Sequence, residues 1–146
     1  MTTDHHIYEL ASLFRSAIVR TDRSKLPITF AEFPAGSCGD AAILLGTFLT
    51  ERGCGDFTYI SAFRGSNDDD SWHTHAWVAQ YDLVVDITAD QFPDSDDPVI
   101  VVRDSPWHSQ FTVDQSHAAH YCVYDANTRH ALKRAYDVVM ENEYAA

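Results

Sequence analysis

The sequence predicts an α+β protein in which a central helix packs on an antiparallel sheet. Two helical patterns come first, several short segments rich in β-branched and aromatic residues follow, and a third helical pattern ends the chain. Helices and strands that are segregated along the sequence in this way are typical of α+β folds. A length of 146 residues suits one domain with its own hydrophobic core, so we expect a single domain over residues 1–146.

Apolar residues at helical spacing predict the helices, the first over residues 5–19 and the second over residues 38–52. The second is apolar on nearly every side between Ala41 and Leu49, which places it at the centre of the domain. Gly53 is a typical C-terminal stop for it. The apolar positions of the first and last helices are Ile7, Leu10, Ala11, Phe14, Ala17 and Ile18, and then Leu132, Ala135, Tyr136, Val139 and Met140.

Short segments rich in β-branched and aromatic residues predict the strands. Two of them form a hairpin that turns at Tyr81 and Asp82, and the irregular connection 21–37 supplies Phe30 and Phe33 as core anchors. The segments expected to form strands are 57–63, 72–80, 83–88, 99–102 and 119–124.

Acidic residues outnumber basic ones by 22 to 10, and the formal net charge is −12. Between Arg64 and Arg103 there is no lysine or arginine, whereas nine aspartates occur there. A nucleic-acid partner is not expected, because phosphate binding needs a basic surface. The negative field of this span stabilises an imidazolium and favours a neutral or cationic substrate. These aspartates are Asp68, Asp69, Asp70, Asp82, Asp86, Asp90, Asp94, Asp96 and Asp97.

The cysteines and the absence of long apolar runs predict the compartment. Cys38, Cys54 and Cys122 are odd in number and form no CxxC pair, so we expect reduced thiols in the cytoplasm. No apolar run approaches the roughly 18 residues of a membrane span, and no secretory signal is visible. A membrane partner is therefore not expected.

The segment from Ser37 to Asp40 carries the first candidate functional residues. Ser37 and Asp40 ahead of an apolar run match a capping box, which makes Cys38 the first helical residue. Unpaired N–H groups and the helix dipole favour a thiolate there, and Gly39 leaves room for a substrate carbonyl. Because the Asp40 carboxylate opposes a thiolate, an imidazolium partner is needed. Alternatively, Cys38 is simply a small buried residue at a helix start.

The predicted hairpin carries a histidine and a carboxylate. With the turn at residues 81–82, the residue numbers of two opposed positions add up to 163. Asp86 then lies opposite Trp77, and His75 lies opposite Thr88, two residues from Asp86. Opposed residues share a face, as do residues two apart, which makes His75 and Asp86 diagonal neighbours. His73 has the same parity, so geometry alone does not choose between the two histidines. The alternative is a polar, outward-facing His75.

Together, Cys38, His75 and Asp86 match the requirements of a cysteine nucleophile. The histidine deprotonates the thiol, the carboxylate fixes its tautomer, and helix N–H groups stabilise the oxyanion. A metal site formed by His73, His75 and Asp86 competes with this interpretation, since two imidazoles and a carboxylate can bind a transition metal. No HExxH motif or second ligand cluster accompanies it, so we expect neither a metal nor another cofactor.

The Cys-His-Asp order and the neighbouring residues resemble the transglutaminase-like branch of the papain-like cysteine peptidase superfamily. The stretch His75-Ala76-Trp77-Val78 is similar to a motif of the leader peptidases of lasso-peptide maturation, and residues 86–92 with 99–107 resemble small bacterial proteins. The resemblance covers about residues 30–107. It implies a papain-like or transglutaminase-like fold, in which the helix that bears Cys38 packs on the sheet.

The resemblance also implies roles for single residues, with Cys38 as the nucleophile, His75 as the general base and acid, and Asp86 as the residue that orients His75. Papain-type enzymes use a glutamine upstream of the cysteine for the oxyanion, whereas no Gln or Asn precedes Cys38 in this chain. We therefore expect the Cys38 backbone N–H to bind the oxyanion, helped by Gln91. The other residues expected around the oxyanion and the substrate are Ser37, Gly39 and Trp77.

The sequence thus predicts a thiol-dependent hydrolase or acyltransferase of the peptidase, transglutaminase or deamidase type, which acts on an amide bond of a peptide or protein. The alternative is a non-catalytic binding, immunity or adaptor protein that keeps the three residues only as structure. The relation between Cys38 and His75 discriminates between them. A histidine against the thiol favours the enzyme, and one turned to solvent favours the binding protein.

Overall fold

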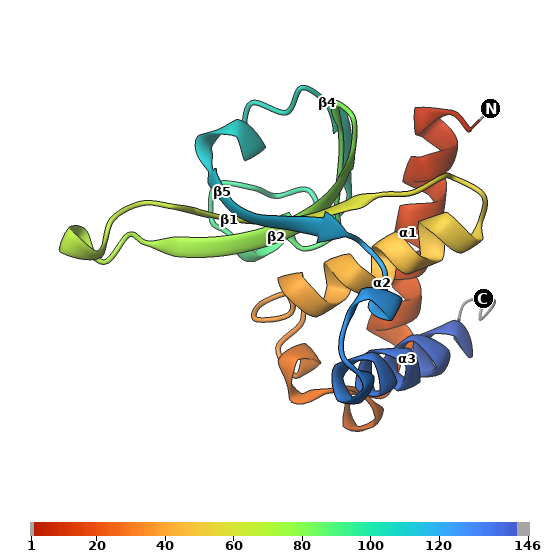
Figure 1. Ribbon diagram of the computed structural model, residues 1–146. Helices are drawn as coiled ribbons and strands as arrows, with labels where there is room; N and C mark the ends of the chain where they lie inside the picture. Colours follow the sequence, from red (N-terminus) through yellow and green to blue (C-terminus); the bar gives the residue numbers. More distant parts are fainter. Residues whose placement is uncertain (1, 143–146) are drawn as a thin grey trace.

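The computed structural model describes residues 2–142, which form an antiparallel sheet and the helices that pack on it. Figure 1 shows α2 beneath the sheet and α3 below α2, while α1 crosses α2 and extends up to the level of the sheet. The helices within these residues are α1 (Asp4–Arg20), α2 (Cys38–Glu51) and α3 (Ala126–Met140). The strands are β1 (Thr58–Arg64), β2 (His73–Gln80), β3 (Leu83–Asp86), β4 (Ile100–Arg103) and β5 (Thr112–Ala118). The predicted α+β class is confirmed.

The sheet has the strand order β4-β3-β2-β1-β5, and every neighbouring pair is antiparallel. The predicted hairpin register is confirmed, because Gln80 pairs with Leu83 and Val78 with Val85. Tyr81 turns the chain with a positive φ of 56°. This register keeps the residues of β2 and β3 on the faces that the sequence pattern predicts.

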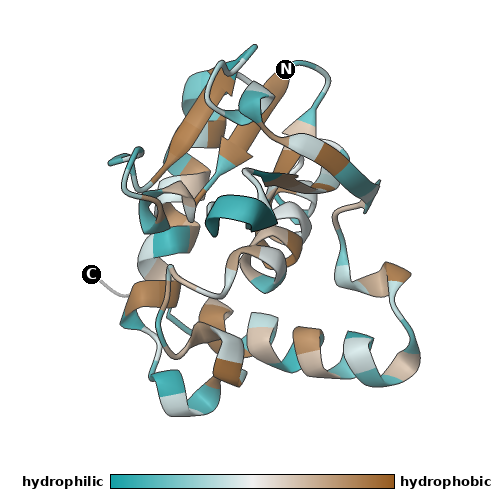
Figure 2. Ribbon diagram, turned by 90° about the vertical axis from the view of Figure 1, so that its left-hand side faces the viewer, coloured by the Kyte–Doolittle hydropathy of each residue, from teal (hydrophilic) through white to brown (hydrophobic). Residues whose placement is uncertain are grey.

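The larger hydrophobic core lies between the sheet and the helices. Nine consecutive residues of α2 are buried, which explains its apolar sequence, and Phe14 of α1 stacks on Phe48 of α2 with ring centroids 4.8 Å apart. The predicted anchors Phe30 and Phe33 are also buried in this core. Figure 2 shows hydrophobic residues along the strands and hydrophilic residues in several connecting segments.

A second, smaller cluster lies on the opposite face of the sheet. Val78 belongs to the larger core, whereas its neighbour Trp77 points the other way and packs with Ala62 and Phe111. Trp107 is half-buried against this cluster. The small cluster surrounds the predicted histidine, so it forms the apolar environment of the candidate site.

The prediction of a strand over residues 119–124 is wrong. The last strand is β5, and Tyr121–Val123 form a 3-10 turn instead. β5 could not be predicted from an apolar pattern, because it is an edge strand whose side chains are nearly all exposed. None of the helices within residues 2–142 is both long and apolar enough to cross a membrane.

Candidate active site

Cys38 is the first residue of α2, as predicted, and it is half-buried. The predicted capping box does not form, because the Ser37 hydroxyl donates to the carbonyl of Pro34 at 3.0 Å. Asp40, the other half of the predicted box, accepts from the Thr29 hydroxyl at 2.7 Å. The first-turn N–H groups of α2 therefore lack a side-chain cap from Ser37, and the positive end of the helix lies at the thiol.

His75 and Asp86 meet on one face of the hairpin, as the register predicts. His75 Nε2 lies 2.7 Å from Asp86 Oδ2, and neither side chain is exposed. The other carboxylate oxygen, Asp86 Oδ1, accepts the backbone N–H of Thr88 at 2.9 Å. An ionised carboxylate is an acceptor only, so His75 carries its proton on Nε2 and leaves Nδ1 as its basic nitrogen.

The Cys38 thiol lies close enough to the His75 imidazole to raise its pKa through hydrogen bonding and charge. Burial lowers the pKa of His75, but the bonds to Asp86 and to Cys38 outweigh it and raise that pKa to about 9. Burial likewise raises the pKa of Asp86, and its bonds to His108 and His75 outweigh it and hold that pKa well below the usual range. A histidine held between a thiol and a buried carboxylate can move the thiol proton.

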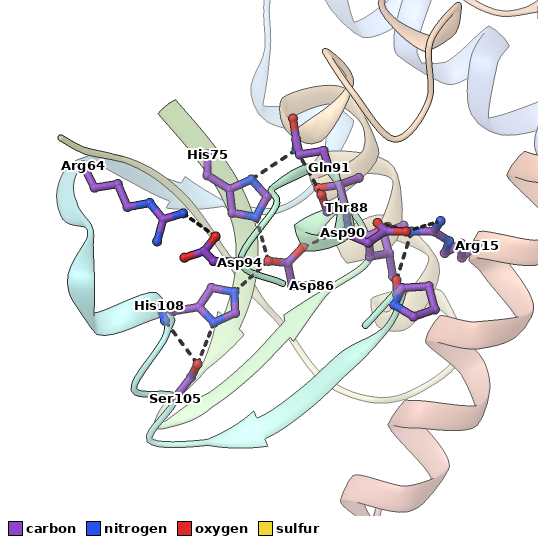
Figure 3. A network of polar contacts seen from close by, with 12 residues as sticks. Arg15, Arg64, His75, Asp86, Thr88, Asp90, Gln91, Asp94, Ser105 and His108 are labelled. Atoms are coloured by element: carbon purple, nitrogen blue, oxygen red, sulfur yellow. Dashed lines mark hydrogen bonds and ion pairs between the residues drawn. The ribbon is translucent and has the colours of Figure 1, made fainter. Parts of the chain in front are cut away.

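The structure adds a second histidine that the sequence argument does not place in the site. His108 Nε2 lies 2.6 Å from Asp86 Oδ2, the same oxygen that binds His75, and its Nδ1 lies 2.6 Å from Ser105 Oγ. Figure 3 shows the two histidines directed at the carboxylate from different segments. His108 is buried and lies 22 residues from Asp86, so no periodicity links them.

Gln91 lies in the 3-10 turn η4 (Ala89–Gln91), directly after β3. Its Nε2 donates to the Thr88 carbonyl at 3.0 Å and lies 3.5 Å from His75 Nδ1 (Figure 3). Gln91 therefore lies beside His75 Nδ1, the nitrogen that is not bonded to Asp86.

The other predicted residues lie in different surroundings. Trp77 is 4% exposed, and its ring packs 5.6 Å from that of His75. Gly39 faces the Tyr59 hydroxyl, which would lie 3.4 Å from a Cβ at residue 39. His73 is exposed and lies beside Phe92, outside the hydrogen-bonded group. The structure therefore selects His75 and not His73.

His75, Asp86 and His108 also have the donor set of a transition-metal site. Their ligand atoms lie within 4.8 Å of one another, and His73, which the metal alternative includes, is not among them. The two N···O distances of 2.7 and 2.6 Å are those of hydrogen bonds. Ligand atoms at about 2.0–2.1 Å from a tetrahedral zinc ion lie roughly 3.3 Å apart. The geometry of His75, Asp86 and His108 is therefore that of a hydrogen-bonded group.

Comparisons with protein-family models, with curated proteins and with solved structures found no match for this chain.

Proposed function

We propose that this protein is a cysteine hydrolase or acyltransferase that acts on an amide bond of a peptide or protein. The observation that carries the proposal is that buried His75 lies 2.7 Å from the Asp86 carboxylate, while Cys38 at the start of α2 is near enough to raise the pKa of that histidine. The sequence motifs around these residues support a transglutaminase-like or papain-like fold for the domain.

The reaction follows from these contacts. His75 Nδ1 takes the proton of the Cys38 thiol, and the thiolate attacks the substrate carbonyl to form a C–S bond. The resulting imidazolium gives that proton to the amine, which leaves as the C–N bond breaks and a thioester forms. Water or a second amine then attacks the thioester and releases the thiol. Asp86 holds the Nε2 proton throughout and stabilises the imidazolium.

The oxyanion has two sources of hydrogen bonds near Cys38. The backbone N–H groups at the start of α2 are not capped by Ser37. The N-terminus of a helix binds anions through such N–H groups. The half-buried Tyr59 hydroxyl lies over Gly39. Burial, followed by the charge of Cys38, raises the pKa of Tyr59, so this hydroxyl keeps its proton and acts as a donor. Tyr59 thus provides a side-chain donor in place of the upstream glutamine that this sequence lacks.

Alkylation by iodoacetamide tests the activation of the thiol. The modification of each cysteine is followed by peptide mass spectrometry from about pH 5 to pH 9, around the range in which thiols titrate. Exposed Cys122 serves as the internal reference. We expect Cys38 to react faster than Cys122 near pH 6, although it is less exposed, and His75→Gln to remove this advantage. A Cys38 profile that follows that of Cys122 at every pH would contradict the proposal.

Acylation by p-nitrophenyl acetate distinguishes an enzyme from a binding protein. We expect an acetyl group on Cys38, visible in the intact mass and located by peptide mapping, with a burst of p-nitrophenol. Cys38→Ala and H75Q are expected to lose both signals, whereas Cys122→Ser retains them. If the wild-type protein is alkylated at Cys38 but never acylated there, the binding-protein alternative is favoured.

A further inference from the structure

The buried Asp86 carboxylate has two histidine partners and one backbone partner. Its Oδ2 lies 2.7 Å from His75 Nε2 and 2.6 Å from His108 Nε2, while Oδ1 accepts the Thr88 N–H. Neither Asp86 nor His75 has an exposed side chain, and that of His108 is 3% exposed. Both histidines therefore bond to the same carboxylate oxygen, and the site is closed to solvent.

The Asp86 carboxylate sets the tautomer of His108, and Ser105 orients the ring. Ser105 Oγ accepts the backbone N–H of His108 at 3.2 Å and lies 2.6 Å from His108 Nδ1. Since neutral His108 donates from Nε2 to the carboxylate, its Nδ1 accepts the Ser105 hydroxyl proton. The chain of donors thus runs from Ser105 through His108 to Asp86, and it meets the donor from His75 on the same oxygen (Figure 3).

Aromatic rings enclose both imidazoles. The Trp107 ring lies 5.7 Å from that of His75 and 4.8 Å from that of His108, and the Trp77 ring lies 4.7 Å from that of His108. Burial of this kind opposes a charged carboxylate unless donors compensate it. With His108 removed, Asp86 would keep only the donors from His75 and Thr88.

We propose that His108, oriented by Ser105, is a positioning residue that keeps Asp86 ionised and its Oδ2 directed at His75. This role rests on the proposed function, because the group it finally serves is the Cys38 thiol. Loss of the donor from His108 allows the buried carboxylate to take up a proton, after which it no longer accepts the His75 N–H as an anion. His75 then loses the partner that stabilises its imidazolium.

Few other charged or titratable groups surround this network. Arg64 of β1 lies over the ring of Trp107 with its guanidinium carbon 5.0 Å from the ring centroid, and it pairs with Asp94 at 2.7 Å. Exposed His73 is the neighbour of His75 on the same face of β2. From α2, Cys38 faces His75 directly. Arg64 also lies over the rings of Phe92 and Phe111, so the Arg64–Asp94 pair is a charged neighbour of the aromatic cluster.

The test uses His108→Leu, His108→Gln and Ser105→Ala in the full chain. H108L keeps the bulk but has no donor, H108Q restores an N–H near Asp86, and S105A removes only the hydroxyl that orients the His108 ring. Two quantities are measured for each variant. One is the rate of Cys38 alkylation near pH 6 relative to Cys122, and the other is the pH titration of the His75 ring nitrogens by ¹⁵N NMR, with urea unfolding as the check on the fold.

We expect H108L to lower the Cys38-to-Cys122 ratio by roughly tenfold and to move the His75 titration to lower pH. H108Q is expected to recover most of both, and S105A to lose a few-fold of the ratio. If H108L does not fold, S105A and H108Q carry the same comparison. The proposal would be overturned if the folded variants kept the His75 titration and the Cys38-to-Cys122 alkylation ratio of the wild-type protein.

The two readouts separate this proposal from the proposed function. A wild-type protein whose Cys38 reacts like Cys122 contradicts the thiol chemistry, whatever the variants do. The His75 titration does not depend on that chemistry. A shifted titration in H108L without any thiol reactivity would therefore support the positioning role and reject the enzyme, whereas fast wild-type alkylation with an unshifted titration rejects the positioning role alone.

Discussion

The His75 imidazole joins three parts of the molecule through its two nitrogens. Nε2 is held by Asp86 from β3, Nδ1 lies 3.5 Å from Gln91 Nε2 of η4, and Cys38 of α2 contributes to the raised pKa of the ring. Because both nitrogens are engaged and the side chain is buried, the protonation of this ring is coupled to the stability of the fold. The coupling has a definite sign.

The pKa of His75 is raised from 6.5 to about 9 in the folded protein. Its contribution to stability is therefore complete below pH 6.5 and is lost as the pH rises through about 9. A shift of this size corresponds to about 3 kcal/mol. We predict that the difference in unfolding free energy between the wild-type protein and H75Q, measured in urea, decreases by about this amount from pH 6 to pH 10. A difference that does not vary with pH would contradict this prediction.

At the scale of elements, α2 is the helix that sets the position of the thiol, and its packing is close. A Cβ at Gly46 would overlap both the Cβ and the carbonyl oxygen of Ala119, so the helix touches the backbone that follows β5. A Cβ at Gly39 would meet only the Tyr59 hydroxyl, at an ordinary contact distance of 3.4 Å. The same helix therefore has one glycine required by packing and one that is tolerant in steric terms.

The pair Gly46→Ala and Gly39→Ala tests this packing. We expect G46A to lower the unfolding free energy by about 2–3 kcal/mol, because the backbone of Ala119 cannot move away freely. G39A serves as the matched control and is expected to change stability by less than about 1 kcal/mol, since alanine is the better helix former. Urea unfolding at one pH measures both. Equal effects of the two substitutions would show that the contact with Ala119 does not restrict α2.

At the scale of the whole molecule, Arg15 connects α1 to the segment that follows β3. Its guanidinium forms two bonds of 2.8 Å to the Asp90 carboxylate and donates to the carbonyls of Ile87 and Pro98 at 2.6 and 3.1 Å. This segment contains Thr88, whose N–H binds Asp86. A helix outside the site thus holds the loop that supports the carboxylate.

We predict that Arg15→Met destabilises the protein by about 2–4 kcal/mol and accelerates hydrogen exchange at the Thr88 amide. The side chains of Arg15 and Asp90 are only 15% and 20% exposed, so the carboxylate is left poorly solvated. Arg103→Met is the control. Arg103 also bonds to two carboxylates, but it is 51% exposed, so its loss is expected to destabilise the protein much less than the loss of Arg15. Equal costs would contradict a special role for Arg15.

The structure also changes the interpretation of the acidic span. Of its nine aspartates, four have basic or histidine partners, so the negative field near the site is weaker than the sequence suggests. The other aspartates include Asp68, Asp69 and Asp70 at the exposed tip between β1 and β2. The paired aspartates are Asp82, Asp86, Asp90 and Asp94, with Arg103, the two histidines, Arg15 and Arg64 as their partners.

Local relations could be predicted from the residues alone, namely that Cys38 begins a helix and that His75 and Asp86 share a face of a hairpin with a two-residue turn. Helical and strand periodicities are properties of a few consecutive residues, so they can be read without the fold. The folded structure was needed to show that His75 and not His73 bonds to Asp86, that His108 shares this carboxylate, and that Tyr59 lies over Gly39. These contacts join segments far apart in the chain, and packing alone brings them together.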